Sequence, residues 1–386
     1  MWKTTEGSTG RLIQFCIGYF FFYIVFLVAT KYFTDYVVQG TVDPASLKAL
    51  LLHMNMEFLV YSTIGGNLLC LLIVFAFRWY RLTSNNPVSF AGMKIPSELI
   101  YIIPSGICTA VVIPTTTLMY TLPISVMVAM VIMRGSIIVI SRIVDAIQIG
   151  QGILKKKVYF QEEMGVVFAI LAVGVQLFYE RGAGNFDFMN YTPAVVILAS
   201  YVTAYFIRLY FMNYYKNTRA KGVKQDNKGF FAVEQITAGI VLSLTGLVLY
   251  HSTSSDVSQI SLFKETFITP SVHWRWEIIA GAFFGAQAFL SVFLFMFKGR
   301  TATFSGLVNR LTSLVAGTAS TLVVYFVFGG KFPGEKDWIS LVFILIAVGF
   351  LSLAERKRML ELSATGGTGP PALTNESAQP SRRRDG

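Results

Sequence analysis

Long apolar stretches recur along almost the whole chain, and each is separated from the next by a short polar segment. A helix needs about 20 mostly apolar residues to cross the hydrocarbon core of a bilayer. We therefore predict an all-α membrane protein with about ten transmembrane helices. The expected spans are 12–30, 57–77, 98–120, 123–143, 162–179, 191–212, 230–250, 276–297, 303–328 and 338–354.

Composition agrees with a membrane environment. Hydrophobic residues make up 54% of the 386 residues and charged residues only 14%, whereas a soluble domain carries roughly 25% charged residues. The three cysteines, Cys16, Cys70 and Cys108, all fall inside apolar stretches. Neither their number nor their placement fits a disulfide framework.

The formal charge of +11 could indicate a nucleic-acid partner, but the positions of the basic residues give a different explanation. Most Lys and Arg residues fall in the two termini and in segments 78–94, 142–157 and 216–228, which share one side if the helices alternate. Basic loops remain cytosolic during insertion. We expect cytosolic N- and C-termini, membrane lipid as surroundings and no nucleic-acid partner. The location would be the Golgi or ER membrane in a eukaryote and the inner membrane in a bacterium.

The two halves of the chain can be aligned as repeats. The alignment places Arg134 on Arg310 and Ser136 on Thr312. Because each half would hold five helices, an odd number, the second half enters the membrane from the opposite side. The expected organisation is a first five-helix repeat over 1–180, an inverted second repeat over 181–362, and a disordered cytosolic tail over 363–386. The tail is rich in Gly, Pro, Ser and Thr.

Two arginines lie deep in expected spans. An arginine near the middle of a bilayer costs at least ~2.5–3.5 kcal/mol on insertion scales, so it should face a cavity or a partner. Arg134 is near the middle of one span and Arg310 lies about two turns into another. They could bind an anionic substrate between the repeats. The alternative is that they pair with backbone carbonyls and hold helices together.

Other polar side chains lie at helical spacing from these arginines or in neighbouring spans. Arg208 follows Tyr201 and Tyr205 on one helix face but is close to the cytosolic edge, where we expect it to snorkel towards water. Hydrogen bonding between helices would explain Gln287 equally well. The candidate substrate-binding residues are Arg134, Asn309, Arg310, Ser313, Gln287, Tyr201 and Tyr205.

The placement of acids and histidines argues against other chemistry. The acids at expected helix ends are Glu57, Glu98, Glu162, Glu163 and Asp337, and none is placed like the buried carboxylate of a proton relay. We therefore expect exchange of one anion for another. The three histidines fall in or beside loops without H-E-x-x-H spacing. We expect no catalytic residues, no metal and no cofactor.

Ten helices in two inverted repeats resemble the drug/metabolite transporter superfamily, and the resemblance covers nearly all of the chain before the tail. Within it, residues 285–289 (GAQAF) are similar to the G-x-Q or GQ-F pattern of nucleotide-sugar transporters. Residues 306–311 (GLVNRL) are similar to the G-A-L-N-K motif of Golgi GDP-mannose carriers. The resemblance implies that Asn309 and Arg310 contact a nucleotide diphosphate, with Arg134 as a second contact.

Two segments depart from these families. Residues 230–235 (FFAVEQ) stand where an F-Y-N-N-like motif is typical, so the sugar and base stay open. Residues 155–158 (KKKV) replace the L-G-E-R-like turn of bacterial exporters, which favours the nucleotide-sugar or organophosphate branch. The expected function is an antiporter of a small anionic metabolite. The alternatives are an exporter of neutral or amino-acid-like solutes, a lipid flippase and a channel. A homodimer is left open.

Overall fold

The computed structural model describes residues 8–33, 44–84, 87–90, 93–121, 126–154, 158–178, 192–218, 225–252, 258–330 and 332–364. Within them the chain forms long helices and one small hairpin. The elements are α1 (Thr9–Lys31), α2 (Pro44–Ala76), β1 (Pro87–Phe90), β2 (Met93–Pro96), α3 (Leu99–Thr121), α4 (Val126–Gly150), α5 (Phe160–Phe178), α6 (Thr192–Asn217), α7 (Asn227–His251), α8 (Ser258–Ile268), α9 (Trp274–Phe295), α10 (Ala302–Phe328) and α11 (Glu335–Ala364).

The all-α membrane character predicted from the sequence is confirmed. Each expected span overlaps one helix, and eight of the described helices are long and apolar enough to cross a membrane. Helices α4 and α5 are not among these eight; α4 carries Arg134, Arg142 and Asp145. The sequence prediction missed α8 and the hairpin. Most of the expected tail, 365–386, lies outside the described residues.

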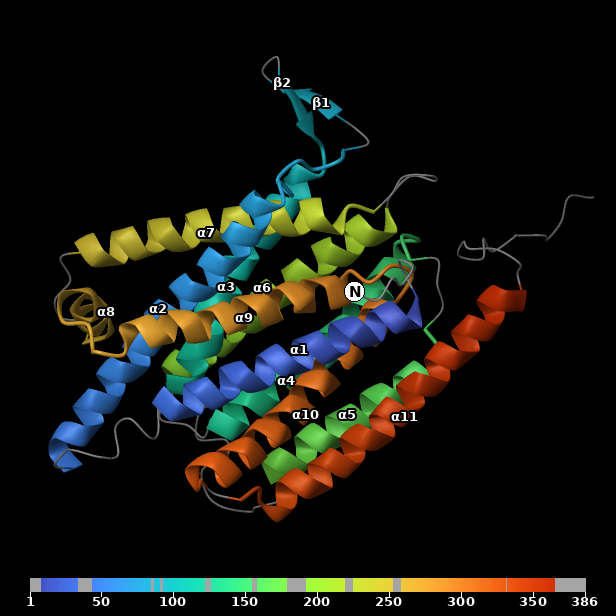
Figure 1. Ribbon diagram of the computed structural model, residues 1–386. Coiled ribbons are helices and arrows are strands. Elements are labelled where there is room, and N and C mark those ends of the chain that lie inside the picture. Colours follow the sequence, from blue (N-terminus) through green and yellow to red (C-terminus); the bar gives the residue numbers. More distant parts are fainter. Residues whose placement is uncertain are drawn as a thin grey trace, which may run out of the picture.

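The long helices pack side by side in one bundle (Figure 1). Helices α5 and α11 pair along one side, α2 packs on α9, and α3 packs on both α6 and α7. The hairpin links α2 to α3 and projects beyond the end of the bundle. Its strands are antiparallel, with Pro87 opposite Pro96 and Phe90 opposite Met93.

Helices α2 and α9 approach so closely that glycine is required where they touch. A Cβ atom on Gly281 would lie 2.2 Å from the carbonyl oxygen of Ser62, and one on Gly65 would lie 2.0 Å from that of Ile278. Small residues of this kind let helix backbones approach in a membrane, where packing replaces the hydrophobic driving force. We call this contact the α2–α9 seam.

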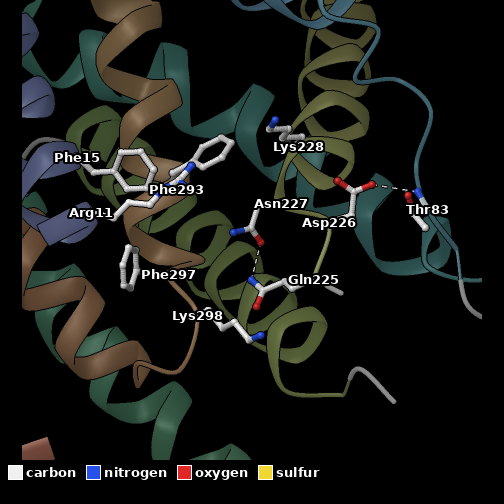
Figure 2. A pocket seen from close by; sticks show the side chains of 10 residues that line it. All are labelled: Arg11, Phe15, Thr83, Gln225, Asp226, Asn227, Lys228, Phe293, Phe297 and Lys298. Atoms are coloured by element: carbon white, nitrogen blue, oxygen red, sulfur yellow. Dashed lines mark hydrogen bonds between the residues drawn. The ribbon is translucent and has the colours of Figure 1, made fainter. Parts of the chain in front are cut away.

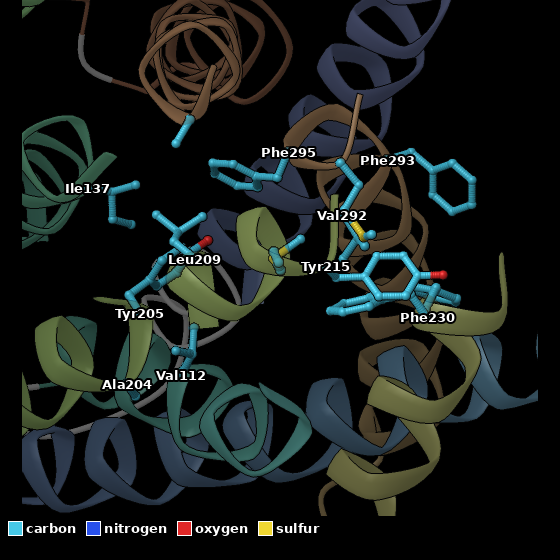
Figure 3. Packing of buried hydrophobic residues seen from close by; sticks show 14 of the residues in the cluster. Val112, Ile137, Ala204, Tyr205, Leu209, Tyr215, Phe230, Val292, Phe293 and Phe295 are labelled. Atoms are coloured by element: carbon cyan, nitrogen blue, oxygen red, sulfur yellow. The ribbon is translucent and has the colours of Figure 1, made fainter. Parts of the chain in front are cut away.

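Aromatic and aliphatic side chains fill the interior between α3, α4, α6, α7 and α9. Figure 3 shows Tyr205 and Leu209 of α6 facing Ile137 of α4 and Phe295 of α9. Leu209 and Ile137 are fully buried. This cluster packs the five helices against one another.

At the end of the bundle where α10 begins, buried acids hold helix ends together. Asp145 of α4 accepts hydrogen bonds from the backbone N–H groups of Ala302 and Thr303, at 2.8 and 2.6 Å. This carboxylate therefore caps the positive N-terminus of α10. Arg300, in the turn before α10, forms an ion pair with Glu355 of α11. Burial lowers the pKa of Arg300 to about 10, and nearby Arg358 acts in the same direction.

The seam can be tested with one methyl group. Gly281→Ala would place a Cβ against a backbone oxygen that cannot move independently, so overpacking of about 1–3 kcal/mol is expected. The melting temperature of the purified protein should fall. Gly349→Ala on α11 is the control, because nothing lies within 4 Å of its Cβ position. Equal melting temperatures for the two variants would contradict the described seam.

Candidate substrate-binding site

A cavity of about 370 Å³ lies inside the bundle and is lined mainly by helices α1, α2, α3, α4, α6, α9 and α10. Its described lining contains no acidic side chain and four basic ones, which are Lys31, Arg134, Arg208 and Arg310. Tyrosines from α1 and α6, threonines from α1 and α3, and Asn55, Gln235, Gln287 and Ser291 add neutral polar groups to the wall. The cavity is therefore positively charged, and the partners of each cation decide how much of this charge is available.

Arg134 of α4 is 3% exposed and contacts only neutral oxygens. Its Nη1 donates to the carbonyl oxygen of Ser313 at 2.8 Å, and its Nη2 donates to the hydroxyl of Tyr23. The guanidinium also lies over the Tyr23 ring, 5.1 Å from the centroid. These contacts orient the arginine without neutralising it.

Arg310 of α10 has a closely similar environment. Its Nη2 donates to the hydroxyl of Tyr205, and its guanidinium lies 5.0 Å from the centroid of that ring. Its Nε is buried without a hydrogen-bond partner. A buried, unused donor on a charged group is costly, and an acceptor from a bound ligand would satisfy it.

Each arginine thus belongs to a group of two tyrosines and one guanidinium. Tyr19 and Tyr23 of α1 stack with centroids 5.6 Å apart, beside Arg134, while Tyr201 and Tyr205 of α6 lie 5.3 Å apart, beside Arg310. Sequence analysis identified the second tyrosine pair but missed the first. Two hydroxyls at i, i+4 spacing in an otherwise apolar helix were the available signal.

Arg208 differs from the other two arginines, and the expectation that it snorkels to water is wrong. It is 6% exposed, and its Nε and Nη2 donate to the two carboxylate oxygens of Glu234 at 2.9 and 3.1 Å. Glu234 also accepts from the hydroxyls of Ser105 and Thr109. The pair joins α6, α7 and α3 because burial makes a mutual partner necessary.

The structure places the remaining candidates in two different positions. Gln287 lines the cavity and its Nε2 lies 3.4 Å from the Tyr19 hydroxyl, while its Oε1 has no partner. Asn309 and Ser313 do not line the cavity. Asn309 donates to Ser291 at 2.8 Å, between α10 and α9, and the Ser313 hydroxyl donates to the carbonyl of Arg310 at 2.8 Å. Five of the seven candidates therefore share the cavity.

The acids are buried more deeply than their positions in the sequence indicated. Glu57 is fully buried inside α2, because this helix begins earlier than expected. Glu98 and Glu162 are also buried, whereas Asp337 is partly exposed and Glu163 of α5 is half-exposed, where it pairs with Arg142. We expected that none of these acids would be a buried carboxylate, and the expectation of anion exchange depended on this. The structure shows that it is wrong for Glu57.

A second pocket, of about 320 Å³, lies where α1 and α7 begin and α9 ends (Figure 2). Arg11, Lys228 and Lys298 contribute its cations. Phe15 packs against Phe293 and Phe297, with ring centroids 5.7 and 6.2 Å apart. One turn beyond Phe15, Tyr19 already lines the central cavity, so this aromatic cluster lies between the two spaces.

Comparisons with known proteins support the fold alone. No protein-family model matches the sequence, and no curated protein matches it. Among solved structures, 16 chains match. One of them, described only as "Crystal structure of protein", is 13% identical, with a TM-score of 0.52, and the match covers 91% of this chain and 99% of that chain. The helix arrangement of this chain is therefore similar to that of a protein solved by crystallography.

The Arg208–Glu234 pair should be important for stability. Glu234→Gln leaves the Arg208 charge buried without a counter-charge, and breaking such a pair typically costs about 3–5 kcal/mol. The melting temperature should fall clearly. Glu163→Gln breaks the Arg142 pair at the surface, which is worth only about 0–1 kcal/mol. Similar small shifts for both variants would show that Arg208 is not held by Glu234.

Proposed function

We propose that this protein is a multi-pass carrier for a small anionic metabolite, such as a nucleotide sugar or a related organophosphate. The observation that carries the proposal is the pair Arg134 and Arg310. Both guanidinium groups line the cavity, and neither has an acidic partner among the described residues. A buried charge without a counter-charge is strongly disfavoured, so an anionic substrate is a natural partner.

The pattern of helix contacts supports ten transmembrane helices in two inverted repeats. If α1 to α5 correspond to α6, α7, α9, α10 and α11, the most extensive contacts between helices of different halves have equivalents. Helix α3 packs on α6 as α9 packs on α1, and α3 packs on α7 as α9 packs on α2. Likewise α4 packs on α6 as α10 packs on α1. The small helix α8 has no equivalent in this scheme.

The same correspondence relates the two halves of the cavity. It places Arg134 of α4 on Arg310 of α10, and the tyrosine pair of α1 on that of α6. Two equivalent cationic groups would then face one substrate at the repeat interface, which is where carriers of this architecture bind. This arrangement matches an elongated anion with a phosphate group and a flat ring.

Phosphate suits arginine in particular. A guanidinium presents parallel N–H donors that match two phosphate oxygens, and the bonds are charge-assisted. The tyrosine rings beside each arginine provide faces on which a base or sugar could stack. The cavity, about 370 Å³, falls within the usual range of about 300–1,000 Å³ for small-molecule sites.

The basic residues give the proposed orientation. With cytosolic termini, the second pocket with Arg11, Lys228 and Lys298 faces the cytosol. The central cavity includes Thr30 and Lys31, at the opposite end of α1. The cavity would then be accessible from the non-cytosolic side and closed from the cytosol by Phe15 and its partners. Exchange of anions and a homodimer remain predictions.

Substitutions of the paired arginines test the proposal. Arg310→Ala and Arg134→Ala should each weaken binding of a nucleoside monophosphate about ten- to a hundredfold, since a charged hydrogen bond contributes ~1.5–3 kcal/mol. Lysine keeps the charge but loses the two-pronged donor, so Arg310→Lys should lie between alanine and wild type. Dissociation constants and ligand-free melting temperatures of the purified variants are the measurements.

Arg142→Ala is the matched control, because Arg142 lies on the same helix as Arg134 but at the surface. It should bind with wild-type affinity. If the arginines only hold helices together, Arg134→Ala will lower the ligand-free melting temperature while the folded protein keeps its affinity. Unchanged affinity in well-folded alanine variants would refute the anion site.

A further inference from the structure

Glu277, in the first turn of α9, is fully buried, and neither of its carboxylate oxygens has a hydrogen-bond partner. Glu277 does not line the central cavity, so the polar groups of that cavity do not supply its missing partner. An ionised carboxylate without partners is strongly disfavoured in an apolar interior. The carboxyl group therefore requires either a bound cation or a proton.

A second buried carboxylate lies across the α2–α9 seam. Ser62 touches Gly281 and Gly66 touches Gly285, so α2 and α9 run in the same direction through the seam. One turn back along both helices brings Glu57 beside Glu277, and the two carboxyl groups interact electrostatically. Glu57 is fully buried as well.

The two carboxyl groups have different partners. Oε1 of Glu57 accepts a hydrogen bond from the backbone N–H of Ser271 at 2.7 Å, just before α9 begins. Glu57 is therefore the better stabilised anion. Glu277 has no such donor, so the proton belongs on Glu277.

The other charged or titratable groups on the elements that pack around Glu57 and Glu277 have contacts of their own or are exposed. Nδ1 of His53 lies 3.8 Å from Oε2 of Glu57, and its side chain is 20% exposed. The Tyr61 hydroxyl donates to the carbonyl of Thr266 at 2.9 Å. The remaining groups have these positions: Arg275 lies over Trp274, Lys264 donates to the carbonyl of Ser252, the ring of His273 lies near Phe33, Glu265 is exposed, and Lys31 of α1 donates to Thr321. Within the described part of the chain, no Lys or Arg pairs with either carboxylate.

A metal ion fits this site poorly. Hard cations take about six to eight oxygen ligands, and the two carboxyl groups offer few oxygens. Among the described residues, no group of three or more His, Cys, Asp or Glu side chains could hold a metal ion. A single proton, in contrast, removes the unfavourable second charge without any further ligand.

We propose that Glu277 and Glu57 form a proton-binding site on the α2–α9 seam, with the proton on Glu277 and His53 as the contact to water. This goes beyond the proposed anion carrier, because it assigns a second ligand at a separate place. Loss of the proton would leave two adjacent negative charges between helices that touch through glycine. Phe58 of α2 and Gln287 of α9 line the central cavity, so the proton would control the packing of two of its walls.

Infrared spectroscopy of the full-length purified protein near neutral pH tests the assignment directly. Wild type should show the C=O stretching band of a protonated carboxylic acid that Glu277→Gln lacks. Glu163→Gln is the control, because that carboxylate is half-exposed and paired with Arg142, so the band should remain. A band of equal strength in Glu277→Gln would overturn the proposal. This measurement does not depend on a substrate, so a negative result would overturn the proton site without testing the proposed anion site.

Thermal stability gives the second readout. The folded protein holds this proton at a pH where the unfolded chain has released it. The contribution of this site to stability is therefore complete at low pH and is lost as pH rises. Between about pH 6 and about pH 9 the melting temperature of Glu277→Gln should fall less than that of wild type. Glu57→Gln should also fall less, because a deprotonated Glu277 then has no charged neighbour. Wild-type pH dependence in both variants would overturn the proposed seam site.

Discussion

The structure depends on the cost of burying charge in an apolar helix bundle. Arg208 meets this cost with Glu234, and Asp145 meets it at the N-terminus of α10. Arg134 and Arg310 instead have tyrosine hydroxyls and a backbone carbonyl, which orient them and leave their charge in place. Glu277 has no hydrogen-bond partner in the described part of the chain. Where the bundle supplies no counter-charge, a ligand or a proton must do so.

These unpaired charges lie next to the parts of the bundle with the closest packing. The α2–α9 seam lets two backbones touch and forms one wall of the central cavity, while α4 and α10 meet where Arg134 reaches the carbonyl of Ser313. The hydrophobic cluster of Figure 3, which includes Tyr205, packs α4, α6 and α9 together. A substrate that neutralises the arginines would therefore act on several helices at once.

Continuous apolar runs were sufficient to predict the long helices, but the short helix α8 has no such run and was missed. Deep arginines were also readable, since a charge in such a run is rare. What the sequence could not show was pairing. From its position in the sequence, Arg208 was expected at the edge of the membrane. The structure instead shows it paired with Glu234 of the next helix. Burial of Glu57 was missed because α2 begins at Pro44, within a segment too polar to read as part of a span.

A nucleoside and its phosphorylated form are a matched pair of ligands that tests phosphate recognition by Arg134 and Arg310. The melting temperature of the purified protein should be measured with a nucleoside and with its monophosphate at equal concentration, because a ligand that binds the folded state raises its apparent stability. We expect stabilisation by the monophosphate and little or none by the nucleoside. Equal stabilisation by both, across the common bases, would contradict a site built on Arg134 and Arg310.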